Sequence, residues 1–340
     1  MQGWFPELYG NDAQKKRIGA AIRDRKLPHA LILEGADGSG KMFFARQIAA
    51  ALSCKSEEGR PCGQCPSCQK ILSGNSPDVT VIDRGERATI GVDAVREARS
   101  DMYLSATEEE HKVYIFNDAH TMNDAAQNAL LIVLEEPPAQ VHVLLLTENA
   151  DCLLQTVRSR AMTFRMNLFT PQEIADYLRK NDPRAERLYS TDQQKFDAAI
   201  YGAGGCIGSA IASLDPVRAE ELAERRRIVH QIISTIASRM DYPSVFQAFS
   251  ALPQQKRQEL CDLLFELIEA IRDLIAIKRA PDVPLLYFAN RSVAEELADS
   301  LGIVRLFRLY ERIDGAICAL SHNANINAVM TLLITDVQNL

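Results

Sequence analysis

The sequence lacks an excess of basic residues. It contains 38 lysines and arginines against 45 aspartates and glutamates, which gives a formal net charge of -7 at pH 7. A protein that grips nucleic acid mainly through its own surface is usually basic. The composition therefore disfavours that class of protein. If the chain works near DNA, we expect its partners to supply most of the positive charge.

Long hydrophobic runs and a leader pattern are also missing. The longest uncharged run, residues 198–214, holds four glycines and is too short for a membrane span. The opening residues, MQGWFPELYG, show no basic segment followed by an apolar core, so we expect no signal peptide. We therefore expect a cytoplasmic protein that has no membrane partner. The six histidines form no spaced set of metal ligands.

Apolar segments in the first half of the chain are short and continuous. Helical patterns separate them, over residues 41–53, 93–105 and 123–134. Continuous rather than alternating hydrophobicity is typical of parallel strands covered on both faces. The pattern predicts an α/β fold with a doubly wound parallel sheet. Its expected strands are HALILEG, VTVID, KVYIFND, VHVLLLTEN and AMTFRM (residues 29–35, 79–83, 112–118, 141–149 and 161–166).

The strand pattern stops after Met166 and helical patterns follow. TPQEIADYLRK predicts a helix start with Thr170 as the N-cap and Glu173 completing a capping box. From Pro216 onward the pattern is helical throughout, with one long helix expected over residues 292–320. We interpret the three arginines at 225–227 as a solvated helix face rather than as a DNA contact.

These patterns divide the 340 residues into three expected domains. The first is a nucleotide-fold domain, the second a small helical lid, and the third a helical bundle. Their expected boundaries are 1–167, with a cysteine-rich module inserted at 54–68, then 168–215 and 216–340.

Half of the eight cysteines are clustered in CKSEEGRPCGQCPSC. Cys54, Cys62, Cys65 and Cys68 have the spacing C-x7-C-x2-C-x2-C, whereas the other four are scattered singly among apolar residues. Two-residue gaps let a short turn aim successive thiolates at one ion, and four thiolates suit tetrahedral Zn²⁺. An iron–sulfur cluster and four free thiols are the alternatives. Because all four positions are protein ligands, the expected zinc is structural.

The stretch GADGSGKM, residues 35–42, satisfies the phosphate-loop pattern G-x-x-x-x-G-K between an expected strand and an expected helix. Gly35 and Gly40 would let backbone N–H groups wrap a phosphate, and Lys41 could reach the β and γ phosphates. Met42 stands where a hydroxyl should coordinate Mg²⁺, and a thioether is a poor ligand for that hard cation. A glycine-rich turn without chemical meaning is the alternative.

The segment KVYIFND ends in Asn117 and Asp118, where an acidic pair is expected. An amide brings no charge to a bound Mg²⁺. Asp118 stands where a longer glutamate would polarise the attacking water. A one-residue shift would instead put Asp118 on the metal and require His120 to assist. Met42 and Asn117 weaken the same ion site, so we do not expect Mg²⁺-dependent hydrolysis, although Lys41 leaves passive nucleotide binding open.

The segment VYIFNDAHTMNDAAQNALLIVLEEPPAQVHVLLLTENADCLLQTVRSRA, residues 113–161, resembles the AAA+ clamp-loader subunits of bacterial DNA polymerase III. Its signature is the LEEPP turn at residues 134–138. The resemblance covers nearly all of the expected first domain and, more loosely, the rest of the chain. The length and the degenerate nucleotide site are most similar to the delta-prime type. The ATP-hydrolysing gamma/tau type would have a Ser or Thr at position 42 and an Asp-Glu pair.

In this family a Ser-Arg-Cys motif supplies an arginine finger to the ATP site of a neighbouring subunit. Ser159-Arg160-Ala161 occupies that place, so the resemblance implies that Arg160 acts catalytically in trans. Without the resemblance, Arg160 would be interpreted as a surface arginine at the start of a strand. Gly208 stands where the family has a lid sensor arginine, and the family carries a zinc module where the clustered cysteines lie.

The resemblance implies a non-hydrolysing, stator-like subunit that helps to load the sliding clamp on primed DNA. Its expected partners are the gamma/tau and delta subunits, joined in a ring by a collar formed by residues 216–340. Its expected cofactor is structural Zn²⁺. An ATP-hydrolysing motor subunit and a free-standing zinc-dependent nucleic-acid-binding protein are the alternatives. The second would bind DNA tightly and with strong salt dependence.

Overall fold

The computed structural model describes residues 3–56, 59–85, 89–238, 242–253, 256–280, 285, 287–288, 290–321 and 324–338. The chain divides into two compact units, residues 1–167 and 168–340, which are treated separately below. Residues 57 and 58 of the expected zinc module lie outside the described residues. None of the described helices combines the length and the apolar character that a membrane span requires.

The first unit is built on a five-stranded sheet in which every pairing is parallel, with the strand order β2-β3-β4-β1-β5. This confirms the predicted α/β fold with a parallel sheet and all five predicted strands. The observed strands are slightly shorter than predicted: β1 (Ala30–Glu34), β2 (Val79–Ile82), β3 (Lys112–Phe116), β4 (Val141–Thr147) and β5 (Met162–Arg165).

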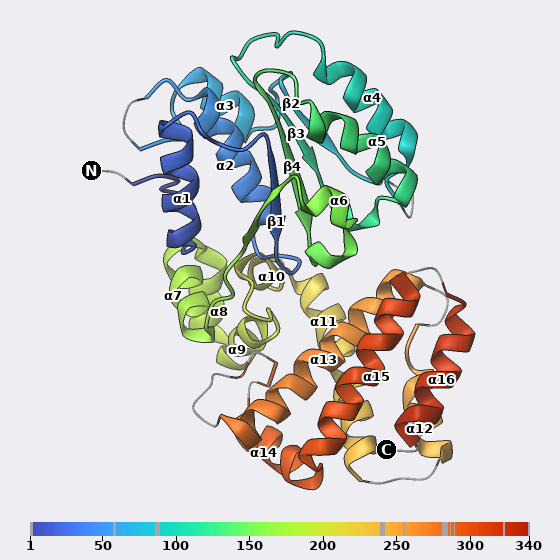
Figure 1. Ribbon diagram of the computed structural model, residues 1–340. Helices are drawn as coiled ribbons and strands as arrows, with labels where there is room; N and C mark the ends of the chain where they lie inside the picture. The colour runs from blue at the N-terminus through green and yellow to red at the C-terminus, as the bar shows by residue number, and fades with distance from the viewer. Residues whose placement is uncertain are drawn as a thin grey trace. The chain divides into compact units, whose positions relative to one another are not determined.

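Helices cover both faces of this sheet (Figure 1), as a doubly wound fold requires. Leu31 and Leu33 of β1 pack into one hydrophobic cluster, and Ala30 and Ile32 pack into the cluster on the opposite face. The first face carries α1 (Asp12–Arg23), α2 (Lys41–Ser53) and α3 (Pro66–Leu72). The second carries α4 (Val92–Met102), α5 (Asp124–Glu135) and α6 (Gln155–Arg158). Short 3₁₀ turns, η1 (Ala119–Thr121) and η2 (Ala150–Cys152), follow β3 and β4.

In the part of the chain that the structure describes, the second unit is helical. Its first helices are α7 (Pro171–Asn181), α8 (Pro183–Thr191), α9 (Gln193–Tyr201) and α10 (Ile207–Ala212). The capping box of Thr170 and Glu173 is present at the start of α7, as predicted. The later helices are α11 (Pro216–Ala237), α12 (Tyr242–Ser250), α13 (Arg257–Arg279), α14 (Arg291–Ser300), α15 (Ile303–Ser321) and α16 (Ile326–Gln338).

Two separate hydrophobic clusters lie within the second unit. One holds residues between Phe169 and Leu214, and the other holds residues between Val229 and Val337. The division into a lid and a bundle near Pro216 stays a prediction.

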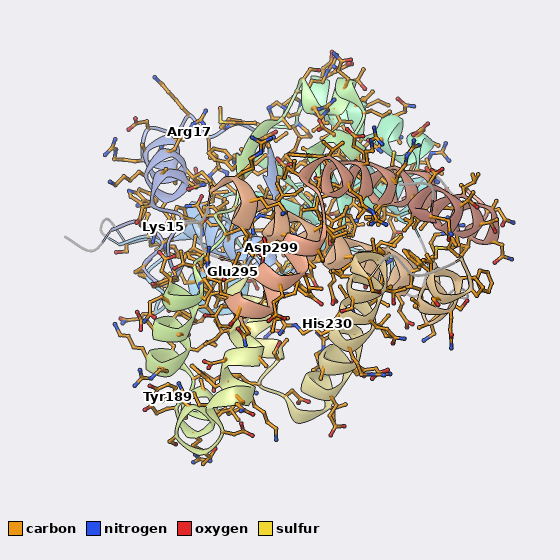
Figure 2. The ribbon with its side chains drawn as sticks, turned by 90° about the horizontal axis from the view of Figure 1, so that it is seen from below. Lys15, Arg17, Tyr189, His230, Glu295 and Asp299 are labelled. Carbon is orange, nitrogen blue, oxygen red and sulfur yellow. The ribbon has the colours of Figure 1, made fainter. Side chains whose placement is uncertain are left out.

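The prediction of one helix over residues 292–320 is wrong, because the chain breaks between α14 and α15. Leu301 adopts an extended backbone and buries its side chain. Gly302 follows it and opens α15, where Leu306 N–H donates to the Gly302 carbonyl at 3.0 Å. Glu295 and Asp299 are exposed on α14 (Figure 2).

The interpretation of residues 225–227 as a solvated face is wrong for Arg226. Its guanidinium donates to the Ala198 carbonyl at 3.1 Å, and its Cζ atom lies 5.4 Å from the ring centroid of Tyr287. Burial lowers the pKa of Arg226. Arg225 forms an ion pair with Glu266 at 2.9 Å. The local charge run does not reveal these contacts, because Ala198 in α9 and Tyr287 between α13 and α14 lie far from Arg226 in the sequence.

Candidate functional site

The phosphate loop joins the carboxyl end of β1 to the first turn of α2. Gly38 and Gly40 have φ angles of +73° and +88°, a region in which glycine is favoured. Gly40 is the N-cap of α2, and its carbonyl accepts the N–H of Phe44 at 2.9 Å. The first backbone N–H groups of α2 therefore face the loop, which is the geometry that binds an anion at a helix start.

Gly35 is required by close packing rather than by its backbone angles. A Cβ atom placed there would lie 2.8 Å from Ser39 Oγ and 2.9 Å from Met166 Cβ. The N–H of Gly35 donates to the Thr147 carbonyl at 3.0 Å, which ties the loop to β4. The sequence pattern predicted a glycine here for phosphate contact, and the structure gives it a packing role as well.

Lys41 is 8% exposed and folds back on its own loop. Its ammonium donates to the carbonyl oxygens of Gly35 and Ala36, the latter at 2.9 Å. Lys41, which the motif predicts to contact a phosphate, therefore forms its hydrogen bonds within its own loop. The three residues predicted to bind a nucleotide, Gly35, Gly40 and Lys41, thus lie in one loop.

Met42 follows Lys41 in the first turn of α2 and contacts the hydrophobic core. Its partly buried side chain packs against the hydrophobic cluster that α1, α2 and α3 form on one face of the sheet. A hydroxyl at this position is the usual protein ligand for a nucleotide-bound Mg²⁺. The cluster instead accommodates an apolar thioether, so this position offers no hard oxygen ligand.

The end of β3 provides the other half of the candidate nucleotide site. The N–H of Asn117 donates to the Ile82 carbonyl at 2.8 Å, and Asp118 adopts a left-handed φ of +51° before η1. Burial lowers the pKa of His120, and the positive charge of Lys41 adds to that effect while Asp118 opposes it. His120 is therefore neutral near pH 7 and lies within electrostatic range of the phosphate-loop lysine.

Arg160 lies between α6 and β5, at the surface of the first unit. Its side chain is 35% exposed, and its Nη2 atom lies 2.7 Å from Oε1 of Glu135. Its Nη1 atom donates to the Thr156 carbonyl at 2.9 Å. The sequence assigned no role to Glu135, because the two residues are 25 positions apart and no local pattern signals their contact.

Thr147 and Asn149 near the end of β4, and Gly208 in α10, have local roles or none. Thr147 is fully buried and its hydroxyl donates to the Asn149 carbonyl at 2.8 Å. The side chain of Asn149 caps η2. Gly208 is exposed in the first turn of α10. None of these contacts requires a nucleotide.

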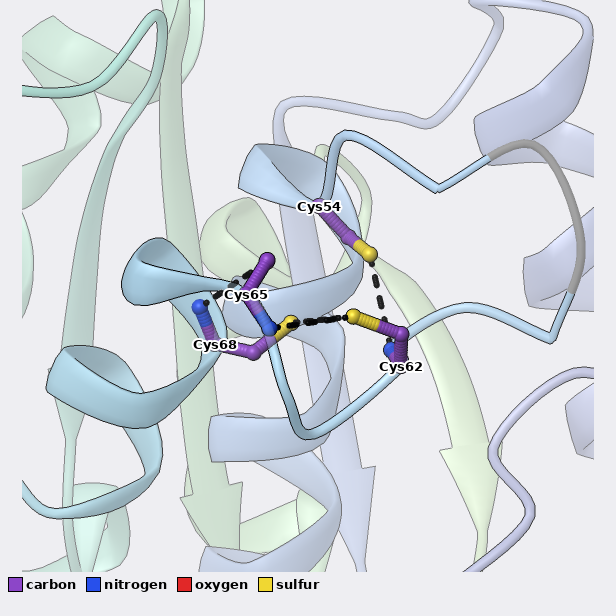
Figure 3. Close-up of side chains that lie close together, drawn as sticks. All are labelled: Cys54, Cys62, Cys65 and Cys68. Carbon is purple, nitrogen blue, oxygen red and sulfur yellow. Dashed lines mark hydrogen bonds between the residues drawn. The ribbon is translucent and has the colours of Figure 1, made fainter.

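The four clustered cysteines come together around one point, at the end of α2 and the start of α3 (Figure 3). The sulfur atoms of Cys54, Cys62, Cys65 and Cys68 all lie within 4.8 Å of one another. Tetrahedral Zn²⁺ with Zn–S bonds of about 2.3 Å needs sulfur atoms about 3.8 Å apart. The Cys62 and Cys68 sulfurs are 4.0 Å apart, so a small contraction of the cluster is enough.

Backbone N–H groups surround these sulfurs. The N–H of Cys62 points at Cys54 Sγ, that of Cys65 at Cys62 Sγ and that of Cys68 at Cys65 Sγ, with distances of 3.4 to 3.5 Å. The amides of Gln64 and Cys65 lower the pKa of Cys62 to about 6. Burial raises the pKa of Cys54 and of Cys68.

Donor type, number and spacing therefore fit a closed metal site such as zinc. Cys54 and Cys68 belong to the same hydrophobic cluster as α2 and β1, so such an ion would lie against the core of the first unit. With four protein thiolates on the ion, no coordination position is left for a substrate.

The chain is similar in sequence to known DNA polymerase III subunits. Residues 10–170 match the family described as DNA polymerase III, delta subunit. The chain is 32% identical over 181 residues to DNA polymerase III subunit gamma of Buchnera aphidicola subsp. Schizaphis graminum, which covers 52% of this chain and 49% of that protein. It is 26% identical over 275 residues to DNA polymerase III subunit delta' of Bacillus subtilis, covering 80% of this chain and 79% of that protein.

A DNA polymerase III gamma subunit-related protein from Thermotoga maritima aligns over 95% of this chain and 98% of its own, with 16% identity and a TM-score of 0.42. The chain spans only 49% to 59% of the length of the first gamma and tau relatives.

Proposed function

This chain belongs, through residues 10–170, to the DNA polymerase III delta-subunit family, and on that premise we propose that it is a structural subunit of a bacterial clamp loader, most like delta-prime. It splits no ATP itself. It presents Arg160 to ATP that is bound by a neighbouring gamma/tau motor subunit. The delta subunit completes the ring, and the assembly loads the sliding clamp on primed DNA.

The observation that carries this proposal is the packing of Met42. Its thioether packs into the hydrophobic cluster, at the position where a motor subunit needs a hydroxyl for Mg²⁺. Asn117 removes a carboxylate from the same ion. Without these ligands the ion that neutralises the developing phosphate charge is poorly held. Passive nucleotide binding by Gly35, Gly40 and Lys41 remains compatible with this role.

The trans role of Arg160 is supported by its exposure. More than a third of the side chain faces solvent, and its cis partner Glu135 is itself 52% exposed. An arginine finger can contribute about 10³- to 10⁵-fold to phosphoryl transfer. A subunit that has no turnover of its own can therefore control the rate of the assembly.

The helices of residues 216–340 are proposed to form the subunit's part of the collar, with residues 168–215 as the lid. The zinc module at Cys54, Cys62, Cys65 and Cys68 is proposed to be structural. Neither role needs a catalytic group from these regions.

A reconstitution experiment tests the proposal. The purified chain is assayed with ATP, Mg²⁺ and primed DNA, alone and with cognate gamma/tau and delta subunits. We expect no turnover by the lone chain, and a complex whose ATPase rate falls at least about tenfold with Arg160→Ala. Arg158→Ala is the matched control, because Arg158 lies two residues before Arg160 and is itself paired with Asp151. Equal rates for the native and Arg160→Ala complexes would remove the trans role.

A second candidate, an ATP-hydrolysing gamma/tau-like motor, is favoured by the 32% identity to a gamma subunit. It requires water to complete the Mg²⁺ shell beside Met42. Appreciable ATP turnover by the isolated chain would establish it in place of the first.

A further inference from the structure

The contacts of Arg160 hold its guanidinium from two directions. Oε1 of Glu135, the last residue of α5, lies 2.7 Å from Nη2. The Thr156 carbonyl, in α6, accepts from Nη1 at 2.9 Å. One acceptor belongs to a side chain and the other to the backbone of a different helix, so together they define the orientation of the planar group.

These contacts leave part of the guanidinium available. Arginine has five N–H donors in a fixed fork, and the contacts with Glu135, Thr156 and the Ser159 hydroxyl engage only some of them. The side chain remains 35% exposed, so an outer edge can meet a ligand without displacing Glu135.

The ion pair is of a kind that contributes little to folding. Both partners are more than a third exposed, and exposed pairs rarely stabilise a protein measurably because solvent screens them. Its physical consequence is instead a loss of rotamer freedom in the arginine side chain. A guanidinium that is already oriented loses less entropy when it binds a phosphate.

We propose that Glu135 is a positioning residue for Arg160, holding its guanidinium ready for the phosphate of a neighbouring subunit. The inference rests on the proposed function, since it assigns a partner to the same trans-acting arginine. Glu135 touches no substrate; it acts only through Arg160.

The test uses the reconstituted complex and steady-state ATPase kinetics. Glu135→Ala is expected to lower kcat about three- to fivefold, the upper range for losing an exposed ion pair, with KM for ATP unchanged. Glu135→Gln keeps an acceptor oxygen without the charge and is expected to recover part of that loss. Glu136→Ala is the matched control, because Glu136 is the next residue, exposed at the end of α5.

A double variant separates positioning from a general structural effect. In the Arg160→Ala background, Glu135→Ala should have no further effect on kcat, since its only route of action is gone. An equal loss in both backgrounds overturns the inference. So does an unchanged kcat for Glu135→Ala when Arg160→Ala is impaired, and in that case the proposed function stands. If Arg160→Ala itself leaves the rate unchanged, the proposed function fails with the inference.

Discussion

The ammonium of Lys41 donates a hydrogen bond to the carbonyl of Ala36 across the phosphate loop, at 2.9 Å. The loop therefore provides its own hydrogen-bond acceptors for the Lys41 ammonium, the group that contacts the phosphate in a phosphate-binding loop. This contact stabilises the loop when no ligand is bound. The consequence is a stability effect that can be measured without ATP.

Lys41→Met should destabilise the nucleotide-free protein by about 1 to 3 kcal/mol, because hydrogen bonds from a charged, buried donor are lost. Urea unfolding without nucleotide measures the change. Lys26→Met is the matched control, since Lys26 is exposed in the same unit. Identical unfolding curves for Lys41→Met and the native chain would show that Lys41 has no structural role in the free loop.

Gly35→Ala should destabilise the first unit by about 1 to 3 kcal/mol, because the added methyl group overpacks the contacts with Ser39 and Met166. Gly91→Ala is the comparison. A Cβ atom at Gly91 meets nothing within 4 Å, and its φ of -78° suits alanine. That variant should be neutral or slightly more stable. Thermal unfolding of the two variants side by side checks the difference, and equal melting temperatures would contradict it.

The cysteine cluster should bind one zinc ion per chain. Cys65→Ala should abolish zinc binding and lower the melting temperature by about 5 °C or more, since binding energy at a structural site is folding energy. Elemental analysis of the purified protein measures the ratio of zinc to chain. Cys152→Ala, outside the cluster, should keep the metal. A native protein that carries iron, or no metal at all, would overturn the zinc assignment.

Glu269 on α13 should make the second unit less stable as the pH rises. Burial, with the nearby charges of Glu266 and Asp273, raises its pKa from 4.5 to about 7. Between these two values the native state binds more proton than the unfolded state, so the free energy of unfolding falls as the pH increases through this window. Above pH 7 the native state carries the full free-energy cost of burying the ionised Glu269 side chain.

Glu269→Gln should therefore stabilise the protein at pH 8, by at most about 3.5 kcal/mol at 1.4 kcal/mol per pKa unit, and should match the native chain near pH 4.5. Denaturant unfolding across pH 4.5 to 8 gives the difference. Asp299→Asn removes an exposed charge on α14 (Figure 2) and should leave the pH profile unchanged. A constant difference between Glu269→Gln and the native chain at all pH values would contradict the assignment.

Much of the fold was accessible from the sequence because its signals are local. The expected strands are short apolar runs, and burial on both faces of the sheet satisfies such runs in the central strands β1, β3 and β4. The capping box at Thr170 lies within four residues. The long helix predicted over residues 292–320 failed for a non-local reason: burial of Leu301 ends α14 at a point where the helical pattern itself continues.

In the candidate sites, too, the sequence predicted the local contacts and missed those between distant segments. Sequence spacing alone predicted that the four clustered cysteines converge, because a short chain segment limits how far apart their sulfurs can lie. It could not reveal the contact between Arg160 and Glu135, or the enclosure of Arg226 by Tyr287 and the Ala198 carbonyl. Each of these contacts joins segments that only folding brings together.

The amino-acid sequence by itself determined which chemical groups this protein has: a phosphate loop without a hydroxyl, a strand end without its first carboxylate, and four thiols at metal-binding spacing. Tertiary structure alone decided where those groups point. It packed the partly buried Met42 against the hydrophobic cluster, folded Lys41 onto its own loop and placed Glu135 beside Arg160. The physical reason is that residue identity fixes which interactions are available, whereas their direction depends on packing between distant segments.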